Sequence, residues 1–98
     1  MSKRDRAMEK EHEQPERWWW LSFAEHGFLG VAIVRSCGFL HAVQAAWDMG
    51  INPGGEVKGS PLTGRPKDES WLNRLLTAEE VDEVNADATE WVRDWWVQ

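Results

Sequence analysis

The sequence predicts an α+β fold: a three-stranded antiparallel sheet, one crossing helix, and a C-terminal amphipathic acidic helix. Two runs rich in aromatic and β-branched residues, 18–24 and 28–35, are separated by a short loop that contains Gly27. An apolar pattern of helical period follows these runs, and the same period returns near the end of the chain. With 98 residues, the chain has room for one domain.

The first two runs are expected to form a β-hairpin that closes over residues 25–27. Placing Ala24 opposite Phe28 fixes a register in which one face of the hairpin is wholly apolar. This face, predicted to be the core face, consists of Trp19, Leu21, Phe23, Leu29, Val31 and Ile33. On the other face, the same register places Trp18 and Trp20 beside small side chains, which predicts a shallow aromatic trough.

A helix is expected from about Gly38 to Met49, with Ser36 as its N-terminal cap and Gly50 as its left-handed end. Its apolar stripe is predicted from residues that recur at spacings of three and four. They are Leu40, Val43 and Trp47, flanked by Ala42 and Ala46.

The segment 52–55, Asn-Pro-Gly-Gly, is typical of a type II turn, because proline presets φ and Gly54 accepts a positive φ. A third strand is expected over 56–60. Since a helix connects it to the second strand, these two strands run parallel, and the strand order 2-1-3 makes every neighbouring pair antiparallel. The β-β-α-β arrangement therefore places Trp18, Trp19 and Trp20 in the central strand.

The end of the chain is predicted to form a short helical turn at 71–76 and then an amphipathic helix. Residues 77–80 match a capping box, and apolar residues follow at helical spacing. Residues 77–98 hold seven acidic side chains against Arg93 alone, so this segment carries the whole net charge of −6. Because no other segment has a basic excess, direct nucleic-acid binding is not expected.

Composition also predicts the domain limits and the compartment. Residues 1–16 are highly charged and almost without apolar groups, which predicts a disordered tail followed by a single domain at 17–98. The longest apolar run, 28–34, is too short to span a membrane, and a soluble cytoplasmic protein is expected. Cys37 and the three histidines show no spacing typical of a zinc site, so neither a metal nor another cofactor is expected.

Sequence motifs do not indicate an enzyme. The chain contains no phosphate-binding loop, nucleophile elbow or zinc-protease motif, and no catalytic residue is assigned. Catalysis would require His41 and Glu56 to converge with Ser22 or Cys37 in one pocket.

Three hypotheses remain for the tryptophans. The leading one is a non-enzymatic binding module that binds or blocks a protein partner through exposed tryptophans and the acidic helix. The alternative is a small ligand, nucleotide-like or a planar anion, held between the trough and the glycine turn. The predicted binding residues are Trp18, Trp20, Asn52, Gly54, Gly55 and Glu56. A purely structural explanation competes with both hypotheses, since the C-terminal helix can cover the trough as part of a packed core.

The C-terminal helix is also the predicted site of self-association. Aromatic side chains are enriched at protein interfaces, and a chain this short gains stability from a partner. A homodimer interface is expected at Trp91, Trp95 and Trp96.

Several segments resemble a group of small uncharacterised proteins from bacterial and phage genomes. The segments are Trp-Trp-Leu-Ser-Phe-Ala (19–24), Phe-Leu-Gly-Val-Ala-Ile-Val (28–34), Gly-Ile-Asn-Pro-Gly-Gly-Glu-Val (50–57) and Leu-Asn-Arg-Leu-Leu-Thr (72–77). The resemblance covers about residues 18–84. It implies no established activity and no catalytic residue, and it favours an accessory or host-interaction role.

Overall fold

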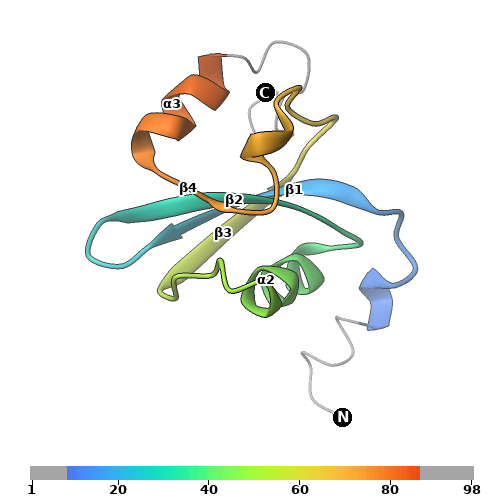
Figure 1. Cartoon of the computed structure of the whole chain (residues 1–98). Coiled ribbons are helices and arrows are strands. Elements are labelled where there is room, and N and C mark those ends of the chain that lie inside the picture. Colours follow the sequence, from blue (N-terminus) through green and yellow to red (C-terminus); the bar gives the residue numbers. More distant parts are fainter. Residues whose placement is uncertain (1–8, 87–98) are drawn as a thin grey trace.

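The computed structural model describes residues 9–86, which form a mixed α+β fold of three layers, with the sheet between two helices (Figure 1). The elements are β1 (Arg17–Ala24), β2 (Phe28–Ser36), α2 (Phe39–Asp48), β3 (Glu56–Pro61), the 3-10 helix η1 (Glu69–Trp71), β4 (Leu75–Leu76) and α3 (Ala78–Ala86). A helical turn at 9–11 precedes β1. The predicted dimer interface at Trp91, Trp95 and Trp96 lies outside the described residues, as do the first eight residues of the predicted tail.

The sheet has the strand order β3-β1-β2-β4, and all its neighbouring strands are antiparallel. The predicted order of the first three strands is therefore confirmed, with β1 and its tryptophans inside the sheet. The predicted number of strands was wrong, because the sheet has four strands in the described part of the chain. Asn73 adopts a left-handed φ of 58°, and its N–H donates to the Ile33 carbonyl at 2.9 Å. This turn brings residues predicted as helical alongside β2.

A β-bulge changes the register of the hairpin. Ala24 lies opposite Phe28 as predicted, but Phe23 pairs with Gly30, which leaves Leu29 as an extra residue in β2. From Phe23 back to Arg17, each residue of β1 therefore pairs with the β2 residue that follows its predicted partner. Trp20 consequently pairs with Ile33 and not with Ala32. The predicted floor of small side chains beside the tryptophans is therefore wrong.

Alternation along the strands divides the core into two layers. The layer beneath α3 contains Trp20, Val31, Ile33, Leu62, Leu76 and Val84, with Trp18 packed against it. The layer beneath α2 contains Leu21, Phe23, Ala32, Val34, Ala42 and Ala46, with Trp19 packed against it. The prediction that Trp19, Leu21 and Phe23 share one face is confirmed, although their partners on β2 differ. Both faces of the sheet are buried, which explains why β1 is apolar along nearly its whole length.

The predicted helix ends are partly confirmed. Gly50 takes a left-handed φ of 72°, and the Ile51 N–H donates to the Ala46 carbonyl at 2.9 Å, which ends α2 as predicted. At the start of α3, the Thr77 hydroxyl accepts from the Glu80 N–H at 3.3 Å, and the Glu80 carboxylate accepts from the Thr77 N–H at 3.1 Å. This reciprocal pair is the predicted capping box. None of the helices within 9–86 is long and apolar enough to cross a bilayer.

Glu80 makes the capping box sensitive to acid. The Arg74 guanidinium hydrogen-bonds its carboxylate and, with the Thr77 N–H, lowers the pKa of Glu80 from 4.5 to about 2. A carboxyl group with a lower pKa in the folded state contributes stability above its unfolded pKa and loses it as pH falls towards the folded pKa. We therefore expect this contribution to disappear between pH 4.5 and about 2.

Urea unfolding of wild-type protein and Glu80→Gln across that pH range measures the effect. The stability difference should be largest above pH 4.5 and should shrink towards about pH 2. Added salt should reduce it, because both partners of the ion pair are partly exposed to solvent. Glu79→Gln is the matched control in the same helical turn. An identical pH dependence of the two variants would contradict the role given to the capping box.

Candidate functional site

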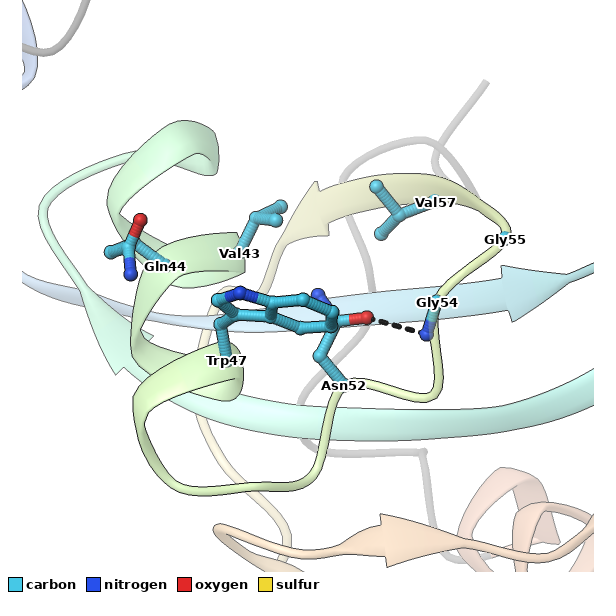
Figure 2. A pocket seen from close by; sticks show the side chains of 7 residues that line it. All are labelled: Val43, Gln44, Trp47, Asn52, Gly54, Gly55 and Val57. Atoms are coloured by element: carbon cyan, nitrogen blue, oxygen red, sulfur yellow. Dashed lines mark hydrogen bonds between the residues drawn. The ribbon is translucent and has the colours of Figure 1, made fainter.

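The candidate site is a hollow of about 430 Å³ between α2 and the edge strand β3 (Figure 2). Its lining residues come from the helix, from the turn that follows it and from the first half of the strand. They are Val43, Gln44, Trp47, Asn52, Gly54, Gly55 and Val57. The turn at 52–55 was predicted as a binding element, whereas Trp47 was predicted as part of the helix core stripe.

Trp47 is the most exposed of the large apolar side chains in the described residues, at 60% exposure. The helix packs on the sheet through Ala42 and Ala46, which are fully buried and let α2 approach closely. Because successive helical residues are rotated by about 100°, Trp47 lies to one side of the contact made by Ala46. The indole therefore reaches over the hollow, and the prediction that it belongs to the core was wrong.

The turn at 52–55 is held by its own hydrogen bond and by two left-handed glycines. The Asn52 side-chain oxygen accepts from the Gly54 N–H at 2.8 Å, as drawn in Figure 2. Gly54 has the predicted positive φ, at 86°. Gly55 has a φ of 73°, and a Cβ atom there would lie 2.6 Å from the Ala24 carbonyl oxygen. Only glycine fits between this turn and the end of β1, so the wall of the hollow has a fixed backbone shape.

The outer edge of β3 has no strand partner among residues 9–86. The Leu62 N–H donates to the Trp18 carbonyl at 2.8 Å, and hydrogen-bonded pairs alternate along an antiparallel ladder. The alternation directs the backbone groups of Ser60 and Lys58 towards β1, and those of Gly59 and Val57 away from it. Pro61 also lies at an outward position, where its missing N–H costs the sheet no hydrogen bond.

The other predicted binding residues do not join this site. Trp20 is only 3% exposed and lies in the layer under α3. Trp18 is half-buried in the same layer, where it lines a separate hollow with Arg17 and Arg35. Glu56 is exposed at the start of β3, opposite Ala24. The sheet therefore separates the two tryptophans from the glycine turn.

A second group of polar residues gathers at the start of α2. Ser36 lies in β2, and the predicted cap is replaced by the Glu11 carboxylate, which accepts from the N–H groups of Leu40 and His41, each at 2.9 Å. Glu11 also contacts His41 Nδ1 at 2.8 Å. Burial alone would raise the pKa of Glu11, but these hydrogen bonds outweigh it and lower the pKa.

Catalysis would require His41 and Glu56 to meet Ser22 or Cys37 in one pocket, and the structure brings only some of these residues together. His41 lies near Cys37 and His12, whereas Ser22 alternates with Trp20 onto the opposite face of the sheet.

The sequence does contain a signal for the position of Trp47. An apolar stripe centred on Ala42 and Ala46 would have placed Trp47 at the edge of the buried face of the helix. The contact with Glu11 has no local signal, because 30 residues separate Glu11 from His41.

Comparisons of the chain with protein-family models, with curated proteins and with solved structures give no match in any of the three.

Proposed function

We propose that the protein is a non-enzymatic binding module that holds an extended segment of a protein partner along β3, with one apolar side chain of that segment in the hollow beside Trp47. The observation that carries the proposal is the position of an indole with 60% exposure next to an edge strand. A tryptophan that gives so little to its own core is available as an anchor for another chain.

The backbone of β3 supports this mode of binding. An extended peptide can add a strand to an open sheet edge, with main-chain hydrogen bonds for affinity and side-chain pockets for specificity. The outward groups of Val57 and Gly59 provide the hydrogen bonds. Pro61 ends the strand and limits the pairing to its first half.

The side chains around the hollow determine what the segment must contain. Val43 and Val57 face each other across the hollow, and the Trp47 indole extends from α2 towards the turn that carries Asn52 (Figure 2). These groups suit an aliphatic or aromatic side chain, whose flat or branched surface packs on the indole. A partner segment with alternating apolar residues presents such a side chain on one face of its strand.

The acidic helix has a secondary part in the proposal. Glu79, Asp82 and Glu83 are exposed on α3, on the opposite side of the sheet from α2. They are therefore too distant to touch a segment bound along β3. Their charge contributes through long-range steering of a basic partner, which salt would weaken.

Selection from a random peptide library on the immobilised protein tests the proposal. We expect enriched peptides with alternating apolar residues, and at least a tenfold loss of their affinity in Trp47→Ala, as for an interface anchor. Val57→Pro should weaken binding similarly, because it removes an outward N–H but none of the bonds to β1. Hydrogen exchange by NMR should show slower exchange of the Val57 and Gly59 amides when peptide is bound.

Phe28→Ala is the matched control, since Phe28 is 48% exposed but does not line the hollow. It should leave peptide affinity unchanged. The proposal fails if no peptide is enriched, or if enriched peptides bind Trp47→Ala as tightly as wild type. If a nucleotide panel quenches the tryptophan fluorescence of wild type but not of Trp47→Ala, while the two amides keep their exchange rates, the small-ligand alternative replaces it.

A further inference from the structure

The start of α2 brings together three side chains that are typical ligands of transition metals. One ring nitrogen each of His12 and His41 and the sulfur of Cys37 all lie within 4.8 Å of one another. The two histidine Nε2 atoms are 3.1 Å apart. His12 follows the helical turn at 9–11, Cys37 follows β2 and His41 lies in α2, so no spacing in the sequence indicates the group.

The separation of the two imidazoles fits a tetrahedral site. With zinc–nitrogen bonds of about 2.0–2.1 Å, two nitrogen ligands of a tetrahedron lie about 3.3 Å apart. The two Nε2 atoms are already near this separation. Cys37 is partly buried and His12 is exposed, so an ion has a path from solvent and a thiolate ligand at the inner side.

The surroundings of His41 are those of a metal ligand. Its Nδ1 faces the Glu11 carboxylate at 2.8 Å, and because a carboxylate only accepts, Nδ1 carries the proton. Nε2 then keeps its lone pair towards His12 and Cys37. A carboxylate that fixes the tautomer in this way is the usual second partner of a zinc-bound histidine. Gly38 leaves the room that Glu11 occupies, since a Cβ atom there would lie 2.3 Å from its carboxyl carbon.

We propose that His12, Cys37 and His41 bind one Zn²⁺ ion, with the fourth position open to water or to a side chain of a partner. Binding displaces the Cys37 thiol proton to solvent and moves the proton that His12 Nε2 donates to His41 onto Nδ1 of the His12 ring. The contact between the two imidazoles is replaced by two nitrogen–metal bonds. The ion joins the helical turn at 9–11 to α2 and so stabilises residues that composition alone predicts as a mobile tail. This site is independent of the hollow beside Trp47.

Titration of the full-length protein with Zn²⁺ alone, followed by calorimetry, tests the site. We expect one ion per chain, a higher melting temperature in excess Zn²⁺, and an affinity that falls with decreasing pH. Cys37→Ser, His12→Ala and His41→Ala should each weaken binding by more than about 100-fold, and Glu11→Gln by about 10–100-fold. With Co²⁺ as the probe, wild type should show a thiolate-to-metal charge-transfer band that Cys37→Ser lacks.

His26→Asn is the matched control. His26 is exposed in the hairpin loop, outside the cluster, and asparagine tolerates its left-handed φ of 57°. Its affinity for Zn²⁺ should equal that of wild type. The absence of a Co²⁺ charge-transfer band in wild type overturns the proposal, even if a variant does not fold. An equal loss of affinity in His26→Asn and His41→Ala also overturns it.

Discussion

Replacing Trp20 by alanine should lower the free energy of unfolding by about 3–5 kcal/mol. Trp20 is 3% exposed and contacts the layer that joins the sheet to α3. A domain of this size has a total stability of about 5–15 kcal/mol. Truncation therefore removes a large fraction of that stability, because the cavity lies where Leu76 and Val84 meet and α3 can collapse only partly into it.

Urea unfolding followed by circular dichroism measures the loss, with Trp47→Ala as the matched control. Both variants remove the same side chain, but Trp47 is 60% exposed and its truncation should cost no more than about 0.5 kcal/mol. Comparing the two variants separates the effect of losing a buried side chain from the effect of losing a tryptophan as such. Equal losses for the two variants would contradict the assignment of Trp20 to the core and of Trp47 to the surface.

These two tryptophans illustrate what the sequence could predict. The elements with local signals were predicted well: the glycine turn at 52–55, the left-handed end of α2 at Gly50, and the capping box at Thr77. Each depends on a few adjacent residues whose conformational preferences suffice to define it. A helical crossover makes its two strands parallel, so placing β3 beside β1 was enough to predict the order of β1, β2 and β3 with every neighbouring pair antiparallel.

Features that depend on distant contacts were missed. The bulge near Phe23 inserts Leu29 into β2, and a hydrophobic pattern that is apolar on both faces cannot reveal such a slip. The shift moved the partners of Trp20 from small side chains to Ile33, which removed the predicted trough. The cap of α2 by Glu11 also depends on a contact between segments far apart in the sequence, as does the pairing of β4.

Gly30 is where the bulge and the unpredicted strand meet, and Gly30→Ala should be among the most destabilising substitutions. The residue has a φ of 150°, and an added Cβ atom would lie 2.7 Å from Leu75 Cδ1 and 2.8 Å from the Leu76 carbonyl oxygen. Overpacking of about 1–3 kcal/mol and backbone strain of a similar size predict a loss of about 2–6 kcal/mol. The backbone contact is decisive, since β4 must move away from β2 to relieve it.

Gly27→Ala separates the two contributions. Gly27 has a φ of 151°, but a Cβ atom there would meet nothing within 4 Å, so this variant carries the strain without the overpacking. The difference in unfolding free energy between the two variants should therefore be about 1–3 kcal/mol. In Gly30→Ala alone, the Leu76 amide should exchange faster with solvent, because the pairing of β4 with β2 loosens. Equal losses in both variants would mean that β4 does not pack closely against Gly30, which would contradict the pairing of β4 with β2.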